Sequence, residues 1–112
     1  KFNDINIEFK DINGKSALVY ASKYNNVNCC IEILRYGCNI ENKCNDKTPL
    51  YWASSRNNIE IVNELLIYGA NTNSLNTKGK WTSLMNASYF GRINIVKLLL
   101  KHGAGVDIIR KD

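Results

Sequence analysis

The sequence predicts an all-α fold, a solenoid built from stacked helix pairs. Three observations predict it. One short pattern recurs three times along the 112 residues, at intervals of 32 and 34 residues. In each copy a glycine follows the initial Ser or Thr after a constant 21 residues, and a shared apolar block lies between the two. A period of this length is typical of repeat proteins in which each unit is one small supersecondary motif.

The first element expected in each repeat is a short helix. The recurring segments are Ser16-Ala17-Leu18-Val19-Tyr20-Ala21, Thr48-Pro49-Leu50-Tyr51-Trp52-Ala53 and Thr82-Ser83-Leu84-Met85-Asn86-Ala87. Each begins with a residue that is a good helix N-cap, and Pro49 falls at the first helical position, where its missing N–H costs nothing. Leucine and alanine three residues apart then share one face of the helix.

A turn and a second helix follow in each repeat. The turns are predicted at residues that tolerate a left-handed backbone, namely Asn25-Asn26, Asn57-Asn58 and Gly91-Arg92. The second helices are expected over roughly 28–36, 60–68 and 94–102, each ending at a glycine suited to the C′ position, Gly37, Gly69 or Gly103. One such pair cannot bury its own apolar face, so the copies must stack into a continuous core.

The period near 33 and the segment Thr48-Pro49-Leu50-Tyr51-Trp52-Ala53 resemble the ankyrin repeat. The resemblance covers essentially the whole chain and implies one ankyrin repeat domain over 1–112. Its repeats are predicted at approximately 11–43, 44–75 and 76–108. Residues 1–10 match the tail of a preceding repeat and 109–112 the start of a following one. We therefore expect the chain to be a segment of a longer array.

The resemblance also implies hairpin fingers between the helix pairs. From glycine to the next Thr the spacing is 11 residues in one case and 13 in the other, so the fingers should differ in shape. The position that the family usually gives to a histidine, which ties neighbouring repeats together, carries Val19, Tyr51 and Met85. This departure predicts fingers that are less firmly held.

Ankyrin repeats are similar to one another in holding a protein partner on a concave face made of finger tips and first helices. Carried over to this sequence, that face predicts partner-binding residues at Asn13, Lys15, Lys23, Tyr24, Asn45, Lys47, Arg56, Lys78, Lys80, Trp81, Tyr89 and Phe90, with Ile12, Cys44 and Ser55 beside them. Trp81 is expected to be the main contact. Tyr89 and Phe90 are either contacts or local core, and Trp52 is expected in the interhelical core.

The formal net charge of +5 is unevenly distributed along the chain. Residues 1–75 hold eight basic and eight acidic residues, whereas 76–112 hold seven basic residues against Asp107 and Asp112. This places the excess in the third repeat and favours an acidic protein partner that docks on its finger. The alternatives are nucleic acid or an anionic membrane surface bound through the same charge, or a recognition arm of a larger enzyme or adaptor. Nucleic acid is disfavoured because aromatic residues with interleaved Arg do not cluster in the sequence.

Catalysis and cofactor binding are not expected. The isolated turn glycines do not match a phosphate-binding loop, and His102 has no nucleophile or carboxylate partner in the pattern. Cysteines at 29, 30, 38 and 44 lack the paired spacing of a zinc site and are expected to be reduced thiols of an intracellular protein, cytoplasmic or nuclear. No apolar run is long enough to cross a membrane. The sequence therefore predicts a non-catalytic binding module without metal or cofactor.

Overall fold

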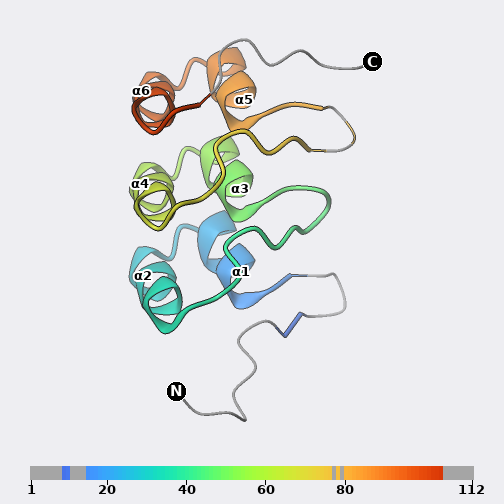
Figure 1. Cartoon of the computed structure of the whole chain (residues 1–112), viewed down its shortest axis with the longest axis vertical. Coiled ribbons are helices and arrows are strands. Elements are labelled where there is room, and N and C mark those ends of the chain that lie inside the picture. The colour runs from blue at the N-terminus through green and yellow to red at the C-terminus, as the bar shows by residue number, and fades with distance from the viewer. Residues whose placement is uncertain (1–8, 11–14, 77, 79, 105–112) are drawn as a thin grey trace.

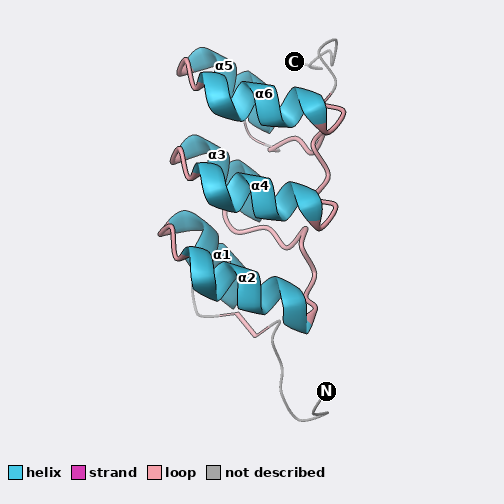
Figure 2. Ribbon diagram, turned by 90° about the vertical axis from the view of Figure 1, so that its left-hand side faces the viewer, coloured by secondary structure: helices cyan, strands magenta, loops and turns pink. Residues whose placement is uncertain are grey.

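The computed structural model describes residues 9–10, 15–76, 78 and 80–104, and this part of the chain contains helices and no named strand. The helices form three successive pairs that stack along one axis (Figures 1 and 2). They are α1 (Ala17–Lys23), α2 (Val27–Tyr36), α3 (Pro49–Ser55), α4 (Ile59–Ile67), α5 (Ser83–Tyr89) and α6 (Ile93–Lys101). The predicted all-α solenoid is confirmed.

The two helices of each pair lie in two parallel rows. α1, α3 and α5 pack on one another in the row beside the fingers, and α2, α4 and α6 form the outer row (Figure 1). Each loop between pairs projects from the same side of the stack before it enters the next inner helix (Figure 1). The inner helices and fingers therefore make one continuous face, which we call the finger face.

Local chemistry sets the helix starts where the sequence places them. The hydroxyls of Ser16, Thr48 and Thr82 accept hydrogen bonds from the backbone N–H three residues later, at 3.4, 3.2 and 3.2 Å. Between the helices of each pair, Asn25, Asn57 and Gly91 take positive φ of 60°, 60° and 67°, as predicted for the turns. The outer helices α2, α4 and α6 begin one residue earlier than expected, and α4 and α6 also end one residue earlier because Tyr68 and His102 are C-caps.

Equivalent positions of the repeats do not have equivalent burial. The leucine three residues before the glycine is buried as Leu34 and Leu66, but Leu100 in the third repeat is 45% exposed. Conversely, Ile61 and Ile95 are buried while Cys29, at the same position of the first repeat, is exposed. The first position loses burial only in the last described repeat and the second only in the first, which indicates that they pack toward the following and the preceding repeat, respectively. The core therefore continues through the stack and leaves an apolar position open at each end of the described part.

The fingers differ as their lengths predict. In the second repeat Cys44 and Lys47 exchange both backbone hydrogen bonds around Asn45 and Asp46, whose φ values are 52° and 64°. This is a two-residue hairpin whose turn requires positive φ at both central positions. The third finger is longer, and its base is closed by the Asn76 N–H bonded to the Trp81 carbonyl at 3.0 Å.

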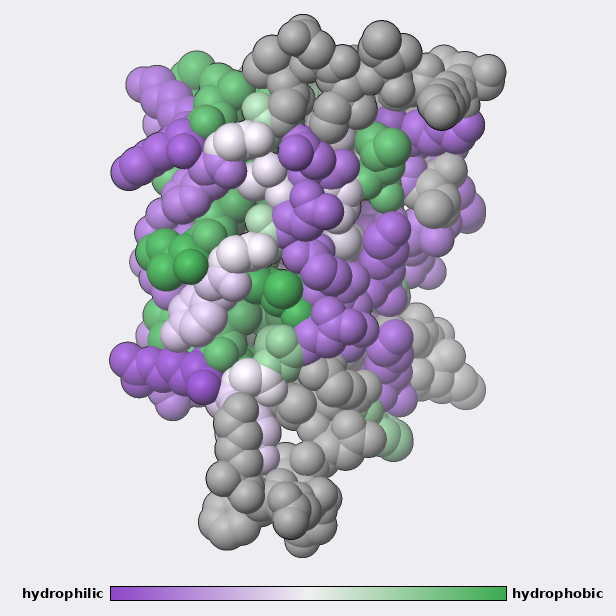
Figure 3. Space-filling model, in the orientation of Figure 1, coloured by the Kyte–Doolittle hydropathy of each residue, from purple (hydrophilic) through white to green (hydrophobic). Residues whose placement is uncertain are grey.

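Polar side chains tie each repeat to the next. The Asn58 amide donates to the Ser22 carbonyl at 2.8 Å, and Arg92, one repeat later at the equivalent N-cap, donates to the Ser55 carbonyl at 3.3 Å. In the segments that lead to the fingers, the Asn71 N–H donates to Glu41 at 2.7 Å. Figure 3 shows the hydrophilic band that runs along this side of the stack. Many of the asparagines thus serve as links and turns rather than as ligand-binding groups.

The sequence predicts loosely held fingers because the histidine of the family is missing. In the second repeat, the tyrosine at that position provides a hydrogen-bonded link instead. The Tyr51 hydroxyl accepts hydrogen bonds from the side-chain amides of Asn76 and Asn86, both at 3.5 Å. Asn76 lies at the base of the third finger and Asn86 on α5. Although these bonds are long, Tyr51 connects the second repeat to the third and supplies the tie that we expected to be missing there.

Alkaline pH should destabilise the fold through Cys30. Burial raises the pKa of this thiol from its usual 9.0 to about 11. The folded chain therefore keeps a proton that the unfolded chain loses, and the free energy of unfolding falls as pH rises from about 9 to 11. The loss should reach at most roughly 2–3 kcal/mol.

Urea unfolding at pH 8 and at higher pH measures this effect. Cys30→Val, which copies the residue found at Val62 and Val96, should flatten the pH dependence, whereas the exposed control Cys29→Ala should leave it unchanged. The pKa of Tyr51 is also raised by burial, but Tyr51 is present in all three proteins and adds the same pH dependence to each. If the free energy of unfolding fell equally steeply with pH in the Cys30→Val variant and in the parent chain, Cys30 would not be the source of the pH dependence.

Candidate partner-binding surface

The finger face and the outer face differ in charge. The inner helices α1, α3 and α5 contain no acidic residue, and the carboxylates carried by helices, Glu32, Glu60 and Glu64, all lie on the outer row. The described loops between the pairs carry Lys43, Lys47, Lys78 and Lys80 against Glu41 and Asp46. Among the described residues, the finger face therefore has more basic than acidic residues.

The first two repeats gather cations around two aromatic rings. Tyr24, which is 51% exposed, has the Lys15 and Lys23 ammonium groups and the Arg56 guanidinium within 5.9 Å of its ring centroid. Tyr20 stacks on Tyr24 at 6.1 Å. These distances are within the range of cation–π attraction. The sequence separates these residues widely, and the stacking of α1 beside α3 brings them together.

Trp52 continues this arrangement into the second finger. Its ring has the Lys23 ammonium at 4.6 Å and the Lys47 ammonium at 4.7 Å from the centroid. The indole N–H donates to the Cys44 carbonyl at 3.2 Å, and Trp52 packs in a small core with Val19 and Cys44. We call the set of Lys15, Tyr20, Lys23, Tyr24, Lys47, Trp52 and Arg56 the basic aromatic cluster. Trp52 is buried as predicted, but Cys44 was wrongly placed on the surface, because the indole covers it.

One prediction about the basic residues needs correction. Among the described residues, no carboxylate forms an ion pair with Lys23, Lys47 or Arg56. These three cations lie together in the first two repeats, in addition to the basic residues that the sequence count places in the third. Aromatic rings with an interleaved Arg, thought to be missing, occur at Tyr24 and Arg56.

The third repeat contributes a chain of aromatic contacts. Trp81 meets the edge of Tyr89 with centroids 5.6 Å apart, and Tyr89 meets Phe90 at 5.0 Å. Tyr89 and Phe90 are 72% and 56% exposed, so they are surface residues and the alternative of local core is wrong. Trp81 itself is half-buried. Large exposed rings beside one another are the residue types that dominate protein interfaces.

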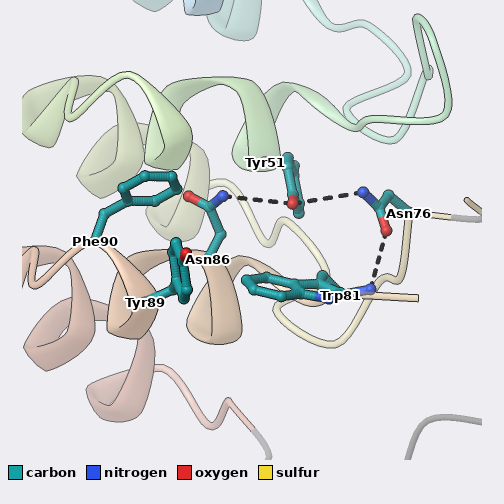
Figure 4. Close-up of a pocket in the computed structure, with 6 residues that line it drawn as sticks. All are labelled: Tyr51, Asn76, Trp81, Asn86, Tyr89 and Phe90. Carbon is teal, nitrogen blue, oxygen red and sulfur yellow. Dashed lines mark hydrogen bonds between the residues drawn. The ribbon is translucent and has the colours of Figure 1, made fainter. Parts of the chain in front are cut away.

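These rings enclose a shallow pocket of about 410 Å³ between the second and third repeats. Figure 4 shows that its residues come from α3, from the third finger and from α5 with its C-cap. The lining is Tyr51, Asn76, Trp81, Asn86, Tyr89 and Phe90. We call it the inter-repeat pocket. Its inner wall is polar, since Asn76 and Asn86 both donate to the Tyr51 hydroxyl there.

The remaining predicted residues are distributed along the finger face. Asn45 and Lys78 are exposed on their fingers, and Lys80 is half-buried with a φ of 53°. Ser55 is half-buried at the end of α3. Ile12 and Asn13 lie outside the described residues.

Sequence reasoning missed three residues of the pocket, namely Tyr51, Asn76 and Asn86. Asn86 occupies the fourth position after the cap, where the other repeats have Tyr20 and Trp52, and a lone amide among aromatic equivalents was a detectable signal. Tyr51 was noticed only as a departure from the expected histidine. Asn76 could not be found from the sequence, because the register of the longer finger sets its position.

Other kinds of site find no support in the described residues. They contain no group of three or more residues able to hold a metal ion. No helix among them is long and apolar enough to span a membrane.

The fold and this surface define a repeat solenoid of helix pairs with projecting fingers. The chain belongs to the ankyrin repeat family: the family model described as ankyrin repeats in three copies matches residues 2–76 and 41–112. No curated protein matches the chain. Ankyrin repeats are generally protein–protein interaction modules and are typically non-catalytic.

Proposed function

We propose that this domain is a non-catalytic interaction module that holds an acidic segment of a protein partner along its finger face. The family supports a protein partner in general terms. The acidic character follows from the separation of charge between the two faces, since the inner helices carry no carboxylate. The predicted residues on the fingers and inner helices form the contact surface.

The basic aromatic cluster is the observation that carries this proposal. Lys23 and Lys47 both lie within 4.7 Å of the Trp52 ring centroid, so their ammonium groups are within about twice that distance of each other. Like charges held this close repel, and no described carboxylate pairs with them. Acidic side chains of a partner would relieve the repulsion, and the exposed rings of Tyr89 and Phe90 farther along the same face provide the apolar contact area that binding hot spots require.

Reversal of charge on the finger face should weaken binding strongly, whereas the same reversal on the outer face should weaken it only slightly. The test pair is Lys47→Glu with Arg56→Glu, and the matched control is Lys97→Glu with Lys101→Glu, which changes net charge equally. As probe we would use a fluorescent peptide of alternating Glu and Ser with one central Tyr, in ~50 mM salt. We expect the finger-face pair to weaken binding by roughly 10-fold or more and the outer pair by about 2-fold. Equal losses would show that net charge alone attracts the peptide and would refute the proposal.

Nucleic acid is the rival ligand, and the same proteins distinguish it. Trp52 is buried, and cations lie over all three rings of the cluster, which leaves little ring surface for bases to stack on. A gel-shift titration with a single-stranded oligonucleotide at ~50 mM salt should therefore show no complex, although phosphate-driven affinity is greatest there. A complex tighter than that of the peptide would favour the rival.

We also propose that another repeat of the same kind packs on the third one in a longer array. The support is Leu100, which is 45% exposed at a position that is buried in both preceding repeats. If this is right, Leu100→Ala in a longer chain that includes the following residues should destabilise the protein as much as Leu66→Ala does. We place the protein inside the cell, where its four thiols would stay reduced, and fluorescence microscopy of a tagged chain tests this.

A further inference from the structure

We propose that the finger face has a cationic half and an aromatic half, and that the partner carries one large apolar side chain about three residues from its acidic ones. This inference rests on the proposed function and adds a second element to the segment that the face binds. It identifies the partner by chemistry, as an extended acidic segment with one apolar anchor.

Equivalent positions of the finger face carry cations in the first two repeats and rings in the third. The positions are the residue before the N-cap of each inner helix, the last residue of that helix and its C-cap. In chain order, the three repeats have Lys15, Lys23 and Tyr24, then Lys47, Ser55 and Arg56, then Trp81, Tyr89 and Phe90. From its N-cap to its C-cap, α5 has no charged residue. The inner row therefore changes from cationic to aromatic between the second repeat and the third.

The cationic half is the basic aromatic cluster of the first two repeats. Lys23 and Lys47 lie over the ring of Trp52, which is itself buried. The rings of this half support the cations and offer little apolar surface of their own. A partner is therefore bound here through its carboxylates.

The aromatic half has the opposite character. Tyr89 and Phe90 are mostly exposed and meet edge to face with centroids 5.0 Å apart. Together with Trp81 they form the outer wall of the inter-repeat pocket (Figure 4). Exposed rings around a hollow suit an apolar anchor, whose burial removes apolar surface of both partners from water. The volume of about 410 Å³ lies near the lower end of ligand pockets, which suits one side chain.

The described cations of the third repeat do not line this pocket. Lys78 lies in the finger beyond the hydrogen bond that closes its base, between Asn76 and Trp81. The Arg92 guanidinium donates to the Ser55 carbonyl at 3.3 Å. A side chain in the pocket therefore meets rings first, and its acidic neighbours in the partner are held by the first two repeats.

The spacing of the two halves follows from the stacking of the inner helices. The cluster lies between α1 and α3 and the pocket between α3 and α5, so they are one repeat apart. Packed helices have axes about 8–10 Å apart, which an extended chain covers in about three residues. An apolar side chain directly beside the acidic residues cannot reach the pocket while they contact the cluster.

The test uses a fluorescent peptide in which a pair of Glu is followed by a pair of Ser and then by Leu. Its control has Asn, which is polar and of similar shape, in place of Leu. We expect the Leu peptide to bind the wild-type chain about 5-fold more tightly than the Asn peptide. A third peptide, with Leu directly after the Glu pair, should bind like the Asn peptide. Equal binding of the Leu and Asn peptides would overturn the inference, and so would equal binding of the two Leu peptides.

A pair of substitutions gives the third repeat the residues of the second. Tyr89→Ser with Phe90→Arg should remove the preference for Leu and create one for a peptide with Glu in its place. The matched control is Ile67→Ser with Tyr68→Arg, at the last residue and C-cap of α4, whose side chains are 60% and 44% exposed. This control should keep the 5-fold preference. If both pairs reduced the preference alike, the aromatic half would not be the site of the anchor.

The two tryptophans of the chain report the two halves separately, since Trp52 lies in the cationic half and Trp81 in the aromatic half. In ¹H–¹⁵N spectra we expect the Leu peptide to shift both indole signals and the Asn peptide to shift mainly that of Trp52. A Trp81 signal that responds equally to both peptides would contradict the assignment. If the Leu and Asn peptides bound equally but the Lys47→Glu and Arg56→Glu pair still weakened binding of the Glu and Ser peptide, the proposed function would stand without this inference.

Discussion

Leu66→Ala should lower the free energy of unfolding by about 2–5 kcal/mol, whereas Leu100→Ala should lower it by less than about 1 kcal/mol. Both residues occupy the same position of their repeats, three residues before the glycine. Leu66 is 4% exposed and belongs to the continuous core, while Leu100 is 45% exposed. The difference arises because a repeat protein is stabilised by contacts between neighbouring repeats.

Equilibrium unfolding in urea measures both changes in one series. The cost of Leu66→Ala combines the lost transfer of the side chain from water with the cavity left between α4 and α6. At Leu100 no buried cavity forms, and alanine is slightly the better helix former. Leu34→Ala, at the third equivalent position, should behave like Leu66→Ala because Leu34 is also buried. Similar costs for Leu66→Ala and Leu100→Ala would mean that the Leu100 side chain is buried and contradict its exposure in this structure.

The repeat fold could be predicted from the sequence because its signals are local. The caps Ser16, Thr48 and Thr82 and the turn residues Asn25, Asn57 and Gly91 each fix one backbone conformation, and the structure shows each of them in it. The outer helices differ from the prediction by a single residue, at the starts of α2, α4 and α6 and at the ends of α4 and α6. The same residue types also recur at the same spacing in all three repeats, so a weak pattern in one repeat can be recognised from the other two.

The binding surface could be predicted only in part, because it depends on how the repeats stack. Lys23 and Lys47 were both predicted as contacts, yet nothing in the sequence shows that they meet at one ring. Counting charges along the chain placed the excess in the third repeat, since such a count cannot separate the two faces. The inter-repeat pocket was missed for the same reason: Tyr51 and Asn86 belong to different repeats and are joined by packing.

The two tryptophans should differ sharply in their contribution to stability. Trp52→Ala should cost about 3–5 kcal/mol, because it removes a buried ring and its packing on Val19 and Cys44. Trp81 is half-buried and meets the exposed ring of Tyr89, so Trp81→Ala should cost less than half as much. Its main effect should be on the affinity for the peptide, because Trp81 is one of the predicted contacts on the finger face.

A conservative variant separates the parts of the Trp52 contribution. Trp52→Phe keeps most of the packing and loses the hydrogen bond from the indole N–H to the Cys44 carbonyl, which should cost about 1 kcal/mol. That carbonyl still accepts from the Lys47 N–H, so no buried acceptor is left unsatisfied. Urea unfolding gives the three values, and fluorescence anisotropy gives the peptide affinity of each variant. If Trp81→Ala proved the more destabilising of the two alanine variants, Trp81 would be a structural residue and its role as a partner contact would be lost.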